Sequence, residues 1–128
     1  MRALLDTQVI LWALTDSPRL SDTAREILLD PANQIYFSSA SIWEISIKHS
    51  LARQDMPVSG SEATRLCRLA GYLELPITSQ HAAATELLPQ HHADPFDRIL
   101  VAQAKSEPMQ LLTHDRILPK YGDNILAV

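Results

Sequence analysis

Short apolar runs alternate with amphipathic runs along most of this chain. Five short runs of aliphatic, β-branched and aromatic residues predict strands, at residues 2–5, 34–38, 72–77, 110–113 and 125–128. Six runs with helical spacing of their apolar positions predict helices, at residues 8–14, 21–30, 41–53, 61–70, 79–88 and 95–106. Strands that alternate with helices are typical of an α/β fold, with a mainly parallel sheet covered on both faces.

Polar residues that can cap helices stand at the starts of the predicted helices. Asp6 or Thr7 is expected to cap the first helix, and Ser39 or Ser41 the third. The second helix begins with a capping pattern at Ser21. The caps of the first and third helices come directly after the predicted strands at 2–5 and 34–38, as expected for a fold in which strands and helices alternate.

Length and composition indicate a single globular domain over residues 1–128. The chain is 46% hydrophobic and 20% charged, and no repeat or linker rich in glycine or serine divides it. The one cysteine, Cys67, excludes a disulfide within the chain and is expected to be a small buried residue. No apolar run is long enough to cross a membrane, and Asp6 and Gln8 interrupt the N-terminal run, so no signal peptide is expected. We therefore expect a cytoplasmic protein.

The stretch HHADPFDRILVAQA, residues 91–104, places two aspartates at the start of an apolar helix. Asp94 before Pro95 is a strong helix start, because the carboxylate can cap free N–H groups and proline suits the first helical position. Asp97 falls in the first turn, where the helix dipole favours an anion. Capping is the better interpretation of Asp94, whereas Asp97 depends on whether other acids lie near it.

Two further aspartates directly follow predicted strands. Asp6 follows the first strand, and Asp115 follows the strand at 110–113 by two residues. In open α/β sheets, ligands bind beyond the carboxyl ends of the strands. Each aspartate alone could be a helix or turn cap, but two on different strands at the same edge suggest a site.

Glu44 lies within the third predicted helix, between Trp43 and Ile45. It could form an ion pair with Lys48, one helical turn later, which would need no function. An acid enclosed by Trp43 and Ile45 would otherwise need a cation. The residues alone leave both interpretations open.

Four carboxylates from four separate segments could therefore converge, namely those of Asp6, Glu44, Asp97 and Asp115. Carboxylates this close repel one another, and a hard divalent cation such as magnesium or manganese would relieve the repulsion. Such a cluster suits hydrolysis of phosphodiester bonds. The net charge of −4 at first disfavours a nucleic-acid partner, but without these four acids and Asp94 the remaining charge is close to zero.

The histidines and possible nucleophiles give weaker signals. His91 and His92 are adjacent and would not share a helix face, and His49 and His81 are expected in helices, at the surface or partly buried. No histidine or cysteine spacing indicates a zinc site, and no serine or cysteine has the local support of a nucleophile.

Four motifs together resemble the PIN-domain ribonucleases of the VapC toxin type. They are LLDTQVILWAL at the N-terminus, SSASIWEISIKHSLAR in the middle, HHADPFDRILVAQA, and LLTHD near the C-terminus. The resemblance implies a three-layer α/β/α sandwich and metal-dependent endonuclease cleavage of RNA with Mg²⁺ or Mn²⁺. It also implies the toxin of a type II toxin–antitoxin module, with a cognate antitoxin, often as a homodimer.

The resemblance also implies roles for individual residues. Asp6, Glu44, Asp97 and Asp115 match the family's acidic metal-binding positions, in the order of the chain. Four more residues match supporting positions: Thr7, Asp94, Arg98 and Thr113. Arg98 could contact a substrate phosphate or a neighbouring acid.

Three other classes fit parts of the sequence. An aspartyl-phosphate phosphatase would use Asp6 as a nucleophile, but Gln8 stands where its second acid is expected. A phosphorylation-dependent receiver would carry paired acids after the first strand, and this chain has only Asp6 there. A catalytically inactive PIN fold, retained for binding an antitoxin or DNA, is a further alternative, although none of the four acids is missing.

Overall fold

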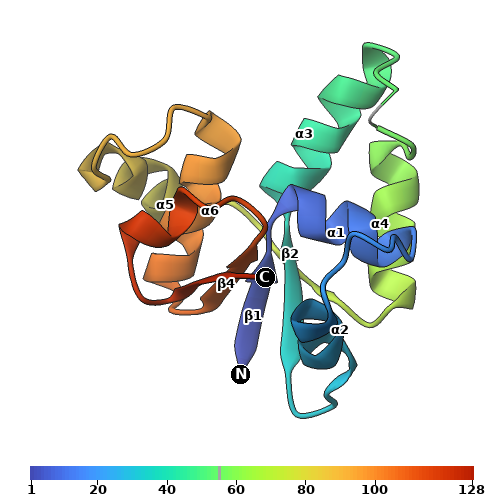
Figure 1. Cartoon of the computed structure of the whole chain (residues 1–128). Helices are drawn as coiled ribbons and strands as arrows, with labels where there is room; N and C mark the ends of the chain where they lie inside the picture. The colour runs from blue at the N-terminus through green and yellow to red at the C-terminus, as the bar shows by residue number, and fades with distance from the viewer. Residues whose placement is uncertain (55) are drawn as a thin grey trace.

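A parallel sheet forms the centre of the structure, a computed structural model that describes residues 1–54 and 56–128 (Figure 1). Its five strands are β1 (Arg2–Leu5), β2 (Gln34–Ser38), β3 (Leu73–Leu75), β4 (Gln110–Thr113) and β5 (Ile125–Ala127). The strand order is β3-β2-β1-β4-β5, and every neighbouring pair is parallel. All the carboxyl ends therefore lie at one edge of the sheet, with β1 in its middle.

Helices cover both faces of this sheet, which confirms the predicted three-layer α/β/α fold. On one side lie α1 (Thr7–Leu14), α2 (Asp22–Leu29) and α4 (Gly60–Leu69). On the other side lie α5 (Ser79–Ala84) and α6 (Pro95–Ser106) (Figure 1). The helix α3 (Ser39–Ser50) continues from β2 past the carboxyl edge and packs against α4, α6 and α1.

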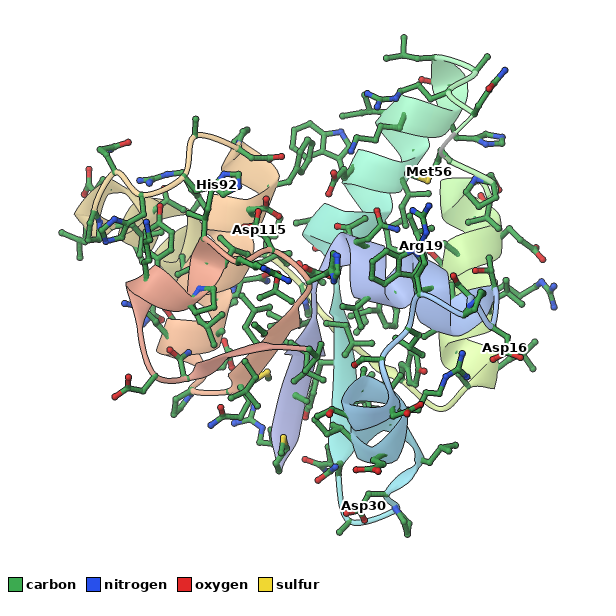
Figure 2. All side chains as sticks on the ribbon, viewed as in Figure 1. Asp16, Arg19, Asp30, Met56, His92 and Asp115 are labelled. Atoms are coloured by element: carbon green, nitrogen blue, oxygen red, sulfur yellow. The ribbon has the colours of Figure 1, made fainter. Side chains whose placement is uncertain are left out.

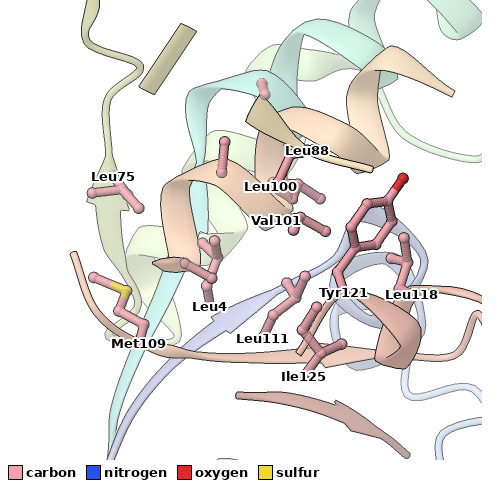
Figure 3. Close-up of a cluster of buried hydrophobic side chains, with 13 residues drawn as sticks. Leu4, Leu75, Leu88, Leu100, Val101, Met109, Leu111, Leu118, Tyr121 and Ile125 are labelled. Atoms are coloured by element: carbon pink, nitrogen blue, oxygen red, sulfur yellow. The ribbon is translucent and has the colours of Figure 1, made fainter. Parts of the chain in front are cut away.

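The alternation of side chains along the strands builds two cores, one on each face. Ala3 and Leu5 point to the face covered by α1, α2 and α4, together with Phe37 and Leu112. Leu4 points to the opposite face and joins the core under α6 that Figure 3 shows. The labelled members of that second core are Leu4, Leu75, Leu88, Leu100, Val101, Met109, Leu111, Leu118, Tyr121 and Ile125.

Most predicted elements are confirmed, with shifts at their ends that have physical causes. The helix α3 begins at Ser39 because Ser38, not Ser39 or Ser41, caps it by accepting from the N–H of Ala40 at 3.0 Å. It ends at Ser50, three residues before the predicted end. The strand β3 ends at Leu75, since the next residue, Pro76, has no N–H to donate to a ladder.

Two short 3₁₀ helices complete the fold. The predicted helix at 79–88 is α-helical only to Ala84 and continues as η1 (Thr85–Leu87). It ends there because Leu88 precedes Pro89 and takes an extended conformation. The second, η2 (Leu118–Tyr121), lies between β4 and β5 and was not predicted.

His81 is fully buried, so the prediction that it lies at the surface or is partly buried is wrong. Its side chain is only 2% exposed. Nδ1 accepts from the N–H of Thr78 in the capping box of α5, and Nε2 lies 2.6 Å from Glu107 Oε2. The ring therefore joins α5 to the residue that follows α6.

Cys67 is a buried free thiol, as predicted. Within residues 1–54 and 56–128, no helix is long and apolar enough to cross a membrane.

Candidate active site

Asp6 lies at the end of β1 and caps α1, in the middle of the carboxyl edge. Its Oδ1 accepts from the N–H of Val9 at 2.8 Å. Its Oδ2 accepts from the Thr113 hydroxyl at 2.5 Å and from the N–H of His114 at 3.2 Å. The carboxylate is buried, and this burial raises its pKa despite these hydrogen bonds. Asp6 is therefore fixed between the ends of β1 and β4.

Glu44 faces the same edge from α3. Its Oε1 accepts from the Thr7 hydroxyl at 2.7 Å, and its Oε2 is 2.7 Å from Lys48 Nζ. The hydroxyl oxygens of Thr7 and Ser41 lie 2.9 Å apart beside it. The ion pair with Lys48, one of the two interpretations from the sequence, is thus present, and it leaves Glu44 beside the other acids.

Trp43 does not enclose Glu44, contrary to the expectation from the sequence. Its side chain is 62% exposed, whereas Ile45 is fully buried. Trp43 instead makes an edge contact with Phe96, with ring centroids 5.4 Å apart. Consecutive helical residues point about 100° apart, so Trp43 and Glu44 face different surroundings.

Asp94 and Asp97 lie at the start of α6. Asp94 caps the helix, as predicted, by accepting from the N–H of Phe96 at 2.8 Å. Asp97 lies in the first turn, and its pKa is raised to about 7. Burial is the main cause, followed by repulsion from Asp94 and Asp6, while His92 acts in the opposite direction. The neighbourhood of Asp97 therefore disfavours its charge unless a cation is present.

Asp115 follows β4 and is held on both of its oxygens. Its Oδ1 accepts from the N–H of Ile117 at 2.7 Å, and its Oδ2 lies 2.8 Å from His92 Nε2. Its own N–H donates to the Thr113 hydroxyl at 2.9 Å. His92 Nε2 also lies 3.4 Å from Asp97 Oδ2, so one ring joins two of the predicted acids.

These acids line one hollow of about 320 Å³ at the carboxyl edge. Its walls come from α1, α3, α6 and the loops around them. The lining residues are Asp6, Thr7, Gln8, Leu11, Glu44, Lys48, Met56, Asp94, Asp97, His114 and Asp115. The structure thus brings together the four acids that the sequence singled out, together with Thr7 and Asp94.

The two other supporting residues lie outside the lining of this hollow. Thr113 lies behind it, where its hydroxyl joins Asp6 to the backbone of Asp115. Arg98 donates to the carbonyl oxygens of Pro89 and Thr85, each at 3.0 Å, and to the Tyr121 hydroxyl at 3.1 Å. It therefore holds backbone instead of an acid of the hollow, and the proposed contact with a substrate phosphate is not favoured.

His92 is the residue of this site that the sequence analysis missed. Figure 2 shows it beside Asp115, near the start of α6. The argument that adjacent residues do not share a helix face does not apply to His92, because His91 and His92 both precede the helix cap Asp94. The signal that could have found it is a histidine two residues before a helix cap, where its ring can turn back over the first turn.

The donor set of the hollow suits a divalent cation. His92, Asp97 and Asp115 each offer one ligand atom, and these atoms lie within 4.8 Å of one another. Carboxylate oxygens are preferred by magnesium and manganese. Burial raises the pKa of Asp6 and Asp97, and for Asp97 the like charges of neighbouring acids add to this effect, so a cation would favour the ionised forms. The residues present therefore fit a bound Mg²⁺ or Mn²⁺.

Comparisons with known proteins agree with this architecture. The family model described as PIN domain matches residues 3–124. No curated protein matches the sequence at a significant level.

Several solved structures share the fold. VapBC2 from Rickettsia felis, bound to a DNA fragment from its promoter, has a TM-score of 0.69 and 17% identity, covering 98% of this chain and 96% of that one. A toxin–antitoxin complex from Klebsiella pneumoniae has a TM-score of 0.68 and 17% identity, covering 97% and 95%. VapBC-1 from nontypeable Haemophilus influenzae has a TM-score of 0.57 and 20% identity, covering 90% and 87%. At this level of identity the likeness shows the fold alone.

Proposed function

The chain belongs to the PIN domain family, and from this premise we propose that it is a metal-dependent endoribonuclease. One observation carries the proposal: carboxylates from four separate segments line a single hollow at the carboxyl edge of the sheet. They belong to Asp6, Glu44, Asp97 and Asp115. Hard divalent cations prefer carboxylate oxygens of this kind, and a cation held there can activate water and stabilise the leaving oxygen in phosphodiester hydrolysis.

In this proposal Asp6, Glu44, Asp97 and Asp115 hold Mg²⁺ or Mn²⁺, directly or through water. When bound, the cation supplies Lewis-acid activation of water and neutralises charge on the phosphate. Thr113 supports the arrangement from behind, because its hydroxyl fixes Asp6 Oδ2 and the backbone of Asp115 at once.

Lys48 and Thr7 hold the fourth acid. Lys48 Nζ and the Thr7 hydroxyl occupy different oxygens of Glu44, so this side chain has one orientation in the hollow. The Lys48 ammonium also lines the hollow and would attract the phosphate backbone of RNA.

We further propose that residues 1–128 act as one PIN domain and as the toxin of a type II toxin–antitoxin pair. The structures of similar fold from R. felis, K. pneumoniae and H. influenzae support this proposal, since the one from K. pneumoniae is named as a toxin–antitoxin complex and the other two are named as VapBC proteins. Its partners would be an RNA substrate, a cognate antitoxin and, in a homodimer, a second copy of the chain. Its place of action would be the cytoplasm.

Cleavage of RNA by the purified chain, freed from any partner, tests the enzymatic part. We expect cleavage with Mg²⁺ or Mn²⁺, none in excess EDTA, and a loss of at least about 100-fold in Asp6→Asn, since loss of a metal ligand should cost more than loss of a group that only orients a ligand. Asp123→Asn, an exposed aspartate outside the hollow, is the matched control. Equal cleavage in EDTA, or a fully active Asp6→Asn variant, would refute the proposal.

Growth of cells that express the chain tests the toxin part. We expect growth arrest by the wild type and none by Asp97→Ala, with relief when a neighbouring gene for a DNA-binding antitoxin is expressed as well. A chain that binds such an antitoxin but cleaves no RNA would instead be an inactive PIN fold retained for binding.

A further inference from the structure

We propose that His92 is a positioning residue that aligns Asp97 and Asp115 for the divalent cation, as a hydrogen-bond donor and not as a ligand. The inference rests on the proposed function. His92, Asp97 and Asp115 are three possible ligands for a cation. In this proposal only the two carboxylates bind the cation, and His92 is a hydrogen-bond donor.

The His92 ring points toward two carboxylates. His92 Nε2 lies 2.8 Å from Asp115 Oδ2 and 3.4 Å from Asp97 Oδ2. These acids come from different segments, one following β4 and the other in the first turn of α6. A single ring nitrogen therefore lies between two carboxylates that would otherwise repel each other.

The hydrogen bond at Nδ1 of His92 decides which ring nitrogen carries the proton. Nδ1 accepts from the N–H of Asp94 at 3.0 Å. A nitrogen that accepts a hydrogen bond carries no hydrogen, so in the neutral ring the proton is on Nε2. That N–H points at Asp115 Oδ2, which makes His92 the hydrogen-bond donor of Asp115, with Asp97 Oδ2 3.4 Å away, and leaves Nε2 without a lone pair for a cation.

Tyr121 and Arg98 fix the position of His92. The N–H of His92 donates to the Tyr121 hydroxyl at 2.9 Å, and Arg98 Nη1 lies 3.1 Å from the same hydroxyl. Arg98 also donates to the carbonyl oxygen of Pro89, so it holds the loop before α6 at several points. Tyr121 is itself anchored in the core under α6, as Figure 3 shows. The position of His92 is thus set by the fold and not by the acids it contacts.

The consequence is a carboxylate pair that is aligned before a cation arrives. Asp115 is held by His92 on Oδ2 and by the N–H of Ile117 on Oδ1, so its plane is fixed. Groups that orient metal ligands typically change metal affinity or activity by 10- to 100-fold. Loss of the His92 donor should weaken cation binding by an amount in that range.

Binding of Mn²⁺ to the whole chain without RNA, measured by calorimetry, is the main test. His92→Phe keeps a ring of similar size but has no donor, and we expect it to weaken Mn²⁺ binding by roughly 10- to 100-fold. His92→Gln can place an amide N–H near the position of Nε2 and should restore most of the affinity. His49→Phe, at an exposed histidine of α3, is the matched control and should bind like the wild type.

RNA cleavage then separates alignment from chemistry. In His92→Phe the loss should be large at limiting Mn²⁺ and should shrink as Mn²⁺ saturates, because the defect lies in holding the cation. A wild type that binds Mn²⁺ and cleaves RNA, with a His92→Phe variant equal to it in both, would overturn the His92 proposal alone. A wild type that neither binds Mn²⁺ nor cleaves RNA would overturn the proposed function.

Nitrogen-15 NMR of the wild-type ring gives a readout that needs no variant and no activity. We expect the signal of a proton on Nε2, and we expect it to persist when Mg²⁺ is added. A ring without a proton on Nε2 in the free protein would overturn the proposal. Loss of the Nε2 proton on addition of Mg²⁺ would also overturn it, because His92 would then be a ligand.

Discussion

Two kinds of carboxylate stand side by side in the hollow. Asp6 accepts three hydrogen bonds, and Glu44 has an ammonium and a hydroxyl within 2.7 Å. Asp97 instead meets mainly burial and the like charges of Asp94 and Asp6. Its ionised form is therefore unfavourable in the folded protein without a cation, and this residue should limit the stability of the metal-free state.

We expect Asp97→Asn to stabilise the metal-free protein, more at about pH 8 than at about pH 5. Folding raises the pKa of Asp97 from 3.8 to about 7, so between these values the folded state binds more protons than the unfolded state. The contribution of this group to the free energy of unfolding therefore falls as pH rises, and its full cost is present above about pH 7. Urea unfolding in EDTA should show a gain of roughly 1–4 kcal/mol at the higher pH.

The control for this prediction is Asp123→Asn, which removes an exposed charge outside the hollow and should show no comparable pH dependence. A gain in Asp97→Asn of the same size at both pH values would mean that ionisation of the buried Asp97 carboxyl is not its cause. A loss of stability at about pH 8 would contradict the prediction outright.

Some features of the site could be predicted from the sequence, and others could not. The convergence of Asp6, Asp115 and Asp97 could be predicted, because strand ends in a parallel sheet share one edge and a helix start can meet them there. The contacts of His92 and Arg98 could not, because both depend on the path of the irregular loop before α6. Sequence spacing carries no information on such a path.

At the level of elements, hydrophobic patterning located most strands and helices, while local chemistry decided their ends. Ser38 belongs to β2 and yet caps α3, so the strand passes directly into the helix and the cap lies before both predicted positions, Ser39 and Ser41. Pro76 and Pro89 end elements whose apolar pattern continues further. The 3₁₀ turn at Leu118–Tyr121 has no apolar period long enough to be recognised.

The packing of α3 against α4 depends on one glycine. A Cβ at Gly60 would lie 1.9 Å from the Ser46 hydroxyl oxygen and 3.3 Å from the carbonyl oxygen of Ile42. We therefore expect Gly60→Ala to lower the free energy of unfolding by about 1–3 kcal/mol, as overpacking does, even though alanine favours helix. Urea unfolding measures this change.

A double-mutant cycle with Ser46→Ala tests the cause of this effect. Removing the Ser46 hydroxyl takes away the closest atom, so the double variant should recover much of the loss. Gly71→Ala is the contrasting control, because its cost comes from a φ of 83° with no atom within 4 Å of the added Cβ, and Ser46→Ala should not relieve it. Additive effects of Gly60→Ala and Ser46→Ala would contradict the steric explanation.

For the molecule as a whole, the strand order ties the site to the core. The central strand β1 pairs with both β2 and β4. Asp6 follows β1, the helix α3 with Glu44 follows β2, and Asp115 follows β4, so pairing of the strands brings the three acids to neighbouring positions. The two cores on the faces of the sheet hold these segments in register. A cation bound between them would therefore bind only the folded chain, and its binding free energy would add to stability.

Cys67 offers a direct measure of that coupling. It is the one cysteine of the chain, it is fully buried in the core that includes Ala3 and Leu5, and burial raises its pKa to about 11. A thiol reagent should therefore label the native protein only after unfolding exposes α4. We expect Mn²⁺ at about 100 times its dissociation constant to slow labelling by about 100-fold, because the metal-bound state does not unfold.

In Asp97→Asn, where the cation loses a ligand, most of this protection against labelling should disappear. Labelling that is fast, or that ignores Mn²⁺ in the wild type, would show that α4 opens without disturbing the hollow.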